Sequence, residues 1–328
     1  MADGSPPRFP SIGARKGLMG LAYHRRVALL DVILGYDCNL FCDYCTITPE
    51  MRGRSLAAGT VAAELSRGRA DGYDEVSFTG GEPTMRPDLL PLVRRARELG
   101  YRGIKIQTNG LLLAEPRNLE RLLAAGATRV HLSIQVHREE AYDRLVRREG
   151  TFPLMVAALD ALVASGVVLV ADVILEEETY RELTGAVRWL HARGVRTVHL
   201  WFVSLTDQNR ENVASMPRMT DVVPFMAEAF AFARESGMEV RSLHVPRCLL
   251  GDDAPHAWDP GSDRVRVVTP DATFDLSESR LAGQLHVPAC EGCAFREICP
   301  GIREDYLARF GDSEIVAARR LPGEPSPA

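Results

Sequence analysis

The chain has 328 residues, of which 46% are hydrophobic and 25% are charged, and these values are ordinary for a globular protein. Its formal net charge is −5, so we do not expect the broad positive surface with which many proteins bind nucleic acid. No apolar run approaches the roughly 20 residues that span a bilayer, and the N-terminus lacks the apolar core of a secretory signal. We therefore expect a cytoplasmic protein with no nucleic-acid partner and no membrane partner.

Between about residues 27 and 203, apolar segments rich in β-branched residues alternate with segments that carry apolar residues at helical spacing. Six such alternations predict a parallel sheet with right-handed crossovers, which is an α/β fold built as a partial (βα)6 barrel. In such folds, ligands bind at the carboxyl ends of the strands. The predicted strands are 27–34, 75–80, 103–108, 129–136, 167–175 and 197–203.

A helix at about 220–235 and a short strand near 238–243 are expected to follow the sixth alternation. Beyond Leu243 the pattern changes to a small hairpin at 264–279 and then to a cysteine-rich segment. The sequence thus predicts a partly disordered N-terminal extension, the partial barrel, a small C-terminal cysteine-rich domain and a disordered tail. Their expected bounds are 1–26, 27–243, 244–320 and 321–328.

The loop after the first strand contains three cysteines, Cys38, Cys42 and Cys45, at C-x3-C-x2-C spacing. In a reducing compartment, clustered cysteines bind metal more often than they form disulfides. Three thiolates suit a [4Fe–4S] cube with one iron left open to an outside molecule, because a fourth cysteine would complete the coordination. A catalytic zinc ion with three protein ligands is the competing interpretation.

This loop, with the aromatic Tyr44 just before its last cysteine, resembles the signature of radical S-adenosylmethionine (SAM) enzymes. The resemblance covers roughly residues 27–203. FTGGEPT, at 78–84, ends the second predicted strand as the family's glycine-glycine-glutamate-proline motif does. QTNG ends the third strand at 107–110, and HLSIQ ends the fourth at 131–135.

The resemblance implies a reaction and a set of cofactors. The open iron of a [4Fe–4S] cluster would bind the amino and carboxylate groups of SAM, and one electron would cleave SAM to a 5′-deoxyadenosyl radical. That radical would abstract a hydrogen atom from the substrate. A flavodoxin- or ferredoxin-type protein would supply the electron, while the chain would position the reactants and exclude water.

The resemblance also implies roles around the methionine end of SAM. Gly80 and Gly81 would let the backbone approach closely, because no Cβ intrudes. The segment formed by Glu82 and Pro83 would present acceptors to the methionine ammonium. Asn109 is expected either to line the site or to cap a turn.

Further SAM contacts are expected from the strand ends. Tyr44 should lie near the adenine through its backbone. Ser133 would reach the ribose hydroxyls, and Gln135 points to the same side of the strand; a polar pair that caps the strand is the alternative. Leu200 or Trp201 in the sixth strand would contact adenine, with core packing as the alternative.

A second cysteine group comprises Cys248, Cys290, Cys293 and Cys299, the last three at C-x2-C-x5-C spacing. It resembles the C-terminal auxiliary-cluster extensions of the same family, called SPASM and twitch. The full SPASM pattern carries seven cysteines and two clusters, whereas four cysteines fit at most one. We expect a second [4Fe–4S] cluster, with a structural zinc site as the alternative. If Cys248 is not a ligand, its thiol could donate a hydrogen atom to a substrate radical, as in some epimerases of the family.

Two substrate classes follow from these resemblances. The first is a small-molecule natural product, such as a sugar or an aminocyclitol, that the enzyme would dehydrogenate, epimerise or rearrange. The second is a ribosomally made precursor peptide that it would crosslink, epimerise or oxidise. A zinc- or iron–sulfur-stabilised binding protein is the third hypothesis, although a purely structural site has no use for the glycine-glycine-glutamate-proline turn.

Overall fold

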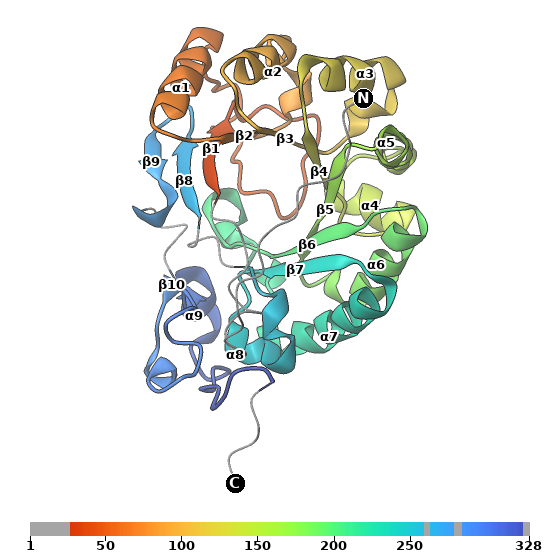
Figure 1. Cartoon of the computed structure of the whole chain (residues 1–328). Helices are drawn as coiled ribbons and strands as arrows, with labels where there is room; N and C mark the ends of the chain where they lie inside the picture. The colour runs from red at the N-terminus through yellow and green to blue at the C-terminus, as the bar shows by residue number, and fades with distance from the viewer. Residues whose placement is uncertain (1–26, 259–262, 279–283, 324–328) are drawn as a thin grey trace, which may run out of the picture.

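The computed structural model describes residues 27–258, 263–278 and 284–323, so the predicted N-terminal extension and the end of the predicted tail lie outside the described residues. The described residues form a curved sheet of strand order β7-β6-β5-β4-β3-β2-β1-β8-β9 (Figure 1). Neighbouring strands from β7 to β8 are parallel, and β9 is antiparallel to β8. The strands are β1 Ala28–Ile33, β2 Glu75–Thr79, β3 Gly103–Thr108, β4 Arg129–Ser133, β5 Val168–Leu175, β6 Thr197–Phe202, β7 Glu239–Leu243, β8 Arg264–Val268 and β9 Thr273–Asp275.

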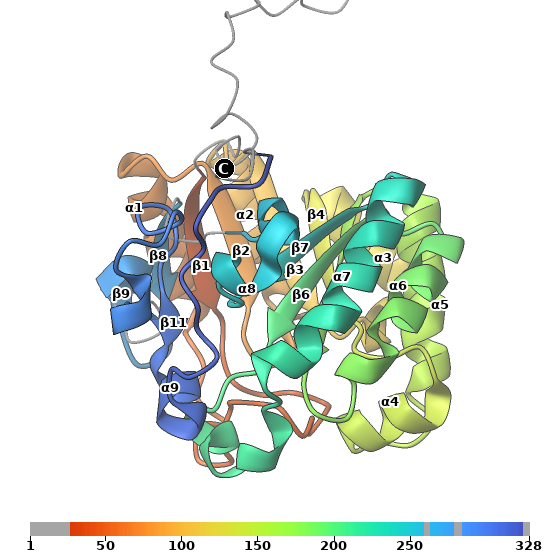
Figure 2. The ribbon, with the colours of Figure 1, turned by 90° about the horizontal axis from the view of Figure 1, so that it is seen from below.

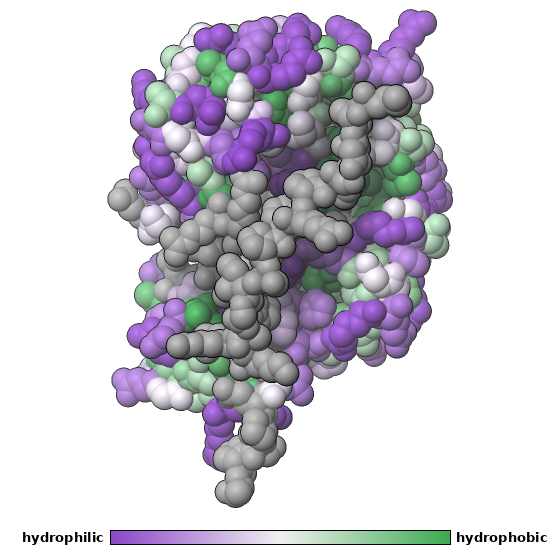
Figure 3. All heavy atoms as spheres, in the orientation of Figure 1, coloured by the Kyte–Doolittle hydropathy of each residue, from purple (hydrophilic) through white to green (hydrophobic). Residues whose placement is uncertain are grey.

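Helices cover the convex side of this sheet (Figures 1 and 2). Their apolar faces explain this packing: α3, for example, buries Leu119, Leu122 and Ala125, three residues apart, while its other side faces solvent. Hydrophilic side chains accordingly dominate the outer helices at the top of Figure 3. The helices are α1 Ala58–Ala70, α2 Leu89–Glu98, α3 Pro116–Ala125, α4 Glu139–Val146, α5 Phe152–Ser165, α6 Leu183–Ala192, α7 Met219–Ser236, α8 Arg247–Leu250 and α9 Glu304–Phe310. The described helices fall short of the length and apolar character that crossing a bilayer requires.

The concave face of the sheet is polar, and this is what positions the site. Successive side chains of a strand point to opposite faces. In β3, Ile104 and Ile106 are buried against the helices, and Lys105 and Gln107 therefore point to the concave side. The same alternation in β4, β5 and β6 lines the concave side with further polar groups.

The α/β fold predicted from the sequence is confirmed, and each of the six predicted strands forms, although β4 ends at Ser133, before the predicted end at 136. The predicted hairpin also forms, but its first strand, β8, pairs in parallel with β1, where Leu30 lies opposite Arg266. The hairpin thereby covers an edge of β1 that would otherwise expose unpaired backbone groups. A segment that the sequence assigned to the C-terminal domain therefore extends the barrel sheet.

The remaining C-terminal segment packs against the loops that follow β6. It contains the short antiparallel pair β10 Gln284–Leu285 and β11 Ile302–Arg303, followed by α9. The Leu205 backbone N–H donates to the Asp305 carboxylate at 2.8 Å, and the rings of Phe202 and Tyr306 lie 5.9 Å apart. This contact places the second cysteine group beside the carboxyl end of the barrel.

Candidate functional site

The three cysteines of the first group lie in a long loop, 34–57, at the carboxyl end of the sheet, where other strand-end loops meet it (Figure 2). The Phe41 N–H donates to the Val146 carbonyl oxygen at 3.2 Å, which ties the loop to the end of α4. The Gln208 N–H donates to the Thr46 carbonyl oxygen, also at 3.2 Å, from the loop after β6. The cysteine loop is therefore held from two sides.

Cys38, Cys42 and Cys45 are all partly buried and are not in disulfides. The backbone N–H groups of Leu40 and Ile47 donate to the Cys38 and Cys45 sulfurs at 3.4 Å each. Burial raises the pKa of all three thiols, and for Cys42 burial together with the nearby Cys45 and Cys38 thiols raises it to about 12. A bound cation would reverse this effect, because coordination deprotonates a thiol. Three convergent sulfurs with N–H donors aimed at them fit an iron–sulfur cluster.

The two glycines of the glycine-glycine-glutamate-proline turn are required by the cysteine loop itself. A Cβ on Gly81 would lie 2.1 Å from the Asp37 carbonyl oxygen, and one on Gly80 would lie 2.2 Å from that of Gly35. Gly80 also has a φ of +125°, which side chains rarely adopt. The Gly81 N–H donates to the Gly35 oxygen at 2.9 Å. The close approach predicted for this turn therefore includes the protein's own backbone.

The Glu82 carboxylate is buried and largely occupied. Its Oε1 accepts hydrogen bonds from the Thr108 hydroxyl at 2.7 Å, from the Thr84 N–H at 3.0 Å and from the Thr84 hydroxyl. Its Oε2 accepts the Asn109 N–H at 2.8 Å. Burial raises the Glu82 pKa, and these hydrogen bonds oppose the rise. Of the two carboxylate oxygens, only Oε2 keeps spare acceptor capacity for a ligand. Pro83, the next residue, is buried and begins a short 3-10 turn.

Asn109 connects the end of β3 to the cysteine loop. Its Nδ2 donates to the Asn39 Oδ1 at 2.7 Å and lies 3.8 Å from the Cys38 sulfur. Its Oδ1 accepts the Leu111 N–H at 3.1 Å. The side chain therefore lies beside Cys38 and also caps a turn.

Two buried side chains at strand ends have polar atoms without partners among the described residues. Gln135 follows β4, is 2% exposed, and leaves both amide atoms unpaired. Glu176 follows β5 directly, is 4% exposed, and leaves Oε1 unpaired. Burying such a group without a partner costs about 1–3 kcal/mol, so both point to a missing ligand. Sequence reasoning missed Glu176, although it is the first residue after the predicted strand 167–175.

The remaining residues predicted to contact SAM are Tyr44, Ser133 and either Leu200 or Trp201. Ser133 ends β4 on its concave side, opposite Asp172 of β5. The Tyr44 phenol lies beside the Cys42 thiol. Leu200 is fully buried against the helices, on the opposite face of β6 from Trp201, because strand residues alternate. The prediction of Leu200 as an adenine contact is therefore not supported by its orientation, and Trp201 is the residue on the concave face.

Sequence reasoning also missed a polar group inside the barrel, formed by His131, Asp172 and His199. Burial lowers the pKa of both histidines, that of His199 to about 4. Burial alone would raise the Asp172 pKa, but His131 and His199 lower it below its ordinary value. At neutral pH the group therefore consists of two neutral imidazoles and one carboxylate. The signal in the sequence was a histidine or an aspartate near the middle of each of three strands.

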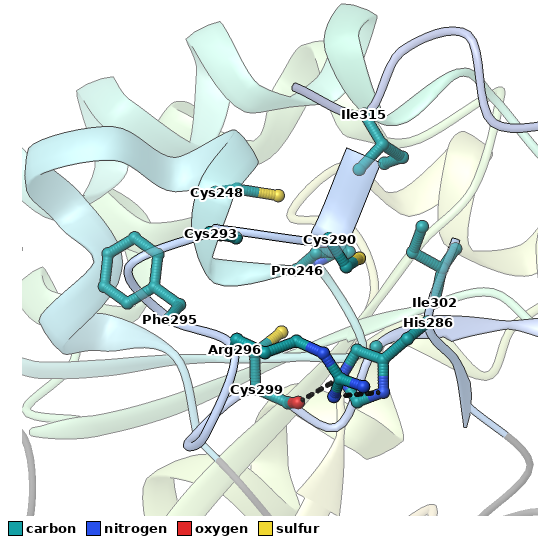
Figure 4. A pocket seen from close by; sticks show the side chains of 11 residues that line it. Pro246, Cys248, His286, Cys290, Cys293, Phe295, Arg296, Cys299, Ile302 and Ile315 are labelled. Atoms are coloured by element: carbon teal, nitrogen blue, oxygen red, sulfur yellow. Dashed lines mark hydrogen bonds between the residues drawn. The ribbon is translucent and has the colours of Figure 1, made fainter. Parts of the chain in front are cut away.

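The second cysteine group does converge. Cys248, on α8, lines one pocket together with Cys290, Cys293 and Cys299 (Figure 4). Burial, together with the proximity of the other three thiols, raises the pKa of Cys248 to about 12. His286 lies at the pocket and is hydrogen-bonded to the Cys299 carbonyl oxygen at 2.9 Å. Four sulfurs brought together from segments 42 positions apart in the chain fit a single metal cluster.

The Glu176 carboxyl gives a test of pH dependence. Burial raises its pKa from about 4.5 to about 7, so between these values the folded state binds a proton that the unfolded state has released. The free energy of unfolding should therefore fall by up to about 3 kcal/mol as the pH rises from 5 to 8. The free energy of unfolding of a Glu176→Gln variant, measured by urea denaturation, should lack this decrease with pH. A Glu98→Gln variant, which changes an exposed residue, should keep the decrease. Equal pH dependence of the unfolding free energy in both variants would contradict the assignment of this effect to Glu176.

Comparison with known proteins identifies the fold family. The family model described as Radical SAM superfamily matches residues 32–190. Similar curated proteins include the PqqA peptide cyclase of Gluconobacter oxydans, 33% identical over 183 residues, or 54% of this chain and 51% of that one. A probable GTP 3′,8-cyclase of Methanopyrus kandleri is 31% identical over 171 residues, or 52% of this chain and 54% of that one. The chain thus spans about half the length of these curated relatives.

Two solved structures share the fold over most of the chain. Streptococcus suis SuiB bound to precursor peptide SuiA has a TM-score of 0.66 and 14% identity, covering 92% of this chain and 77% of that one. Native anSMEcpe with bound AdoMet and Cp18Cys peptide has a TM-score of 0.65 and 16% identity, covering 90% and 94%. The family match spans the cysteine loop and the glycine-glycine-glutamate-proline turn, so residues 32–190 of the chain match a radical SAM domain.

Proposed function

We propose that the chain is a radical SAM enzyme that abstracts a hydrogen atom from a polar substrate. The observation that carries this is the packing of the turn at Gly80 and Gly81 against a loop that presents Cys38, Cys42 and Cys45. When bound at these thiols, a [4Fe–4S] cluster supplies the electron that splits SAM. The protein's part is to hold the cluster with three ligands only and to orient SAM beside it.

Individual residues then have defined parts in holding SAM. The Asn109 amide steadies the loop at Cys38, as its hydrogen bonds show. The spare lone pair of Glu82 Oε2 can accept from the methionine ammonium. Ser133 ends β4 and Gln135 follows it, and the unpaired Gln135 amide is the stronger candidate for a direct hydrogen bond to SAM.

Replacing Gln135 with leucine separates binding from stability. Leucine has no polar atoms to bury, so we expect the variant's melting temperature to be equal to or above that of the wild type. We expect its Kd for SAM to rise about 10- to 100-fold, since a hydrogen bond to a buried amide is lost. Equilibrium dialysis with labelled SAM measures this. Asn118→Leu, on the outer helix α3, should leave the Kd unchanged, and an unchanged Kd in Gln135→Leu would exclude the contact.

We further propose that the second cysteine group holds an auxiliary [4Fe–4S] cluster of the SPASM/twitch type, with Cys248 as a ligand. The mutual proximity of all four thiols supports ligation over a role as hydrogen-atom donor. Anaerobically reconstituted protein should then contain about eight irons per chain. Cys248→Ala should lower this number. If the iron content stays at about eight and only the reaction product changes, Cys248 is the hydrogen donor.

Two substrate classes remain, and each has a specific observation in its favour. The polar, charged concave face, with Lys105 and Asp172 on it, suits a hydroxylated small molecule such as a sugar or an aminocyclitol. The similarity to a peptide cyclase, and the fold shared with two proteins solved with bound peptides, favours a precursor peptide. Deuterium transfer from labelled substrates of each class into 5′-deoxyadenosine distinguishes them, because only the true substrate gives up its hydrogen.

A further inference from the structure

Three metal-ligating side chains meet on the concave face of the barrel, away from both cysteine groups. They are His131 on β4, Asp172 on β5 and His199 on β6, and one ligand atom of each lies within 4.8 Å of those of the other two. The His131 Nδ1 lies 3.2 Å from the Asp172 Oδ2, and the His199 Nδ1 lies 3.7 Å from the Asp172 Oδ1. The two imidazole rings are 5.4 Å apart at 69°.

These separations are close to those around a tetrahedral zinc ion. Ligand atoms bound at about 2.0–2.1 Å in tetrahedral geometry lie roughly 3.3 Å from each other. The observed distances of 3.2 and 3.7 Å bracket this value. The third separation, between the two imidazoles, is at most 4.8 Å, so the side chains would have to rotate to bring all three groups to one ion. Two histidines and one carboxylate are also a known ligand set for catalytic zinc.

The surroundings hold these groups in place. All three come from adjacent strands, and Asp172 lies directly opposite His199 in the register of β5 and β6. The Trp201 Nε1–H donates to the Asp172 Oδ1 at 3.1 Å, which is the kind of outer hydrogen bond that orients a ligating carboxylate. The Trp258 ring stacks on His199 with centroids 6.3 Å apart. Ligands on rigid strands with such support need little reorganisation to bind.

One side of the group is open. The His199 side chain is 21% exposed, whereas those of Asp172 and His131 are 3% and 7% exposed. A fourth coordination position would thus face the barrel interior on the His199 side. Lys105 acts electrostatically on both histidines and opposes the binding of any divalent cation. The two imidazole donors, rather than the charge, favour a transition-metal ion over oxygen-seeking Mg²⁺ or Ca²⁺.

We propose that His131, Asp172 and His199 form a binding site for a divalent transition-metal ion of the zinc class. Its open position would take an oxygen or nitrogen atom of a molecule bound in the barrel. The site uses nitrogen and oxygen donors only, so it is chemically distinct from the two sulfur sites. A hydrogen-bonded His–Asp–His group that binds no metal is the competing account of the same contacts.

The test uses the full-length protein, reconstituted anaerobically so that both cysteine groups are filled with iron. A small excess of Zn²⁺ is added, free metal is removed on a desalting column, and zinc and iron are measured by mass spectrometry. Zinc-edge X-ray absorption then identifies the donors. We expect about one zinc per chain, with nitrogen and oxygen neighbours near 2.0 Å and no sulfur at about 2.3 Å.

Variants of His199 and of a control histidine test whether the zinc is bound by this group. His199→Ala and the more conservative His199→Gln should each lower the affinity for zinc at least tenfold without changing the iron content. His191→Ala, on the outer helix α6, should bind zinc as the wild type does. Failure of the wild type to retain zinc, or sulfur neighbours in its spectrum, would overturn the proposal. Because iron and 5′-deoxyadenosine are measured separately, that result would leave the function of the cysteine groups unaffected.

Discussion

Replacing Gly81 with alanine is expected to prevent assembly of the cluster at Cys38, Cys42 and Cys45. The added Cβ would lie 2.1 Å from the Asp37 carbonyl oxygen, so the cysteine loop must move away from β2. Overpacking of this kind typically costs 1–3 kcal/mol. We expect the iron content to fall from about eight to about four per chain and the rate of 5′-deoxyadenosine formation to fall at least 100-fold.

The control for this variant is Gly59→Ala at the start of α1. Nothing lies within 4 Å of a Cβ built at Gly59, and alanine favours helix more than glycine does. This variant should keep its iron and its activity. Wild-type iron content in Gly81→Ala would show that the loop tolerates displacement, and it would contradict the role assigned to the turn.

Replacing Glu82 with alanine is the second substitution with a large expected effect. The change leaves the Thr108 hydroxyl and the Asn109 and Thr84 N–H groups without their acceptor in a buried setting. Each such loss costs about 1–3 kcal/mol, partly offset because a buried charge is removed. We expect the free energy of unfolding to fall by about 3 kcal/mol, as measured by urea denaturation, and SAM binding to be lost with it.

Glu120→Ala on the outer face of α3 provides the comparison for Glu82. Glu120 is exposed, so its loss should change the free energy of unfolding by less than about 0.5 kcal/mol. If Glu82→Ala unfolds like the wild type but no longer binds SAM, Glu82 acts on the ligand alone. If it is as stable as the wild type and binds SAM normally, the organising role derived from its hydrogen bonds is wrong.

The sequence predicted the barrel strands well, because each is a short apolar run bounded by turns and followed by a helical segment. Two features could not be predicted from the sequence, for physical reasons. The pairing of β8 with β1 joins residues more than 230 positions apart, as between Ala28 and Arg264, and no local pattern encodes it. The partners of Glu82 come from the end of β3, so they depend on which strands are neighbours.

The site was predicted in part. The convergence of Cys248 with Cys290 was a hypothesis from resemblance, and the structure brings these thiols into one pocket. The choice between Leu200 and Trp201 depended on which face of β6 turns inward. That face could have been deduced from alternation, because His199 is polar and lies on the same side as Trp201.

The central claim is that three thiols hold a cluster with one iron open to SAM. The most direct test incubates anaerobic, iron-loaded protein with SAM and dithionite and measures 5′-deoxyadenosine by chromatography. We predict that the wild type forms it and that Cys42→Ala does not, although that variant still holds about four irons at its other cysteines. Iron-loaded wild type that leaves SAM intact, or equal product from Cys42→Ala, would contradict the account.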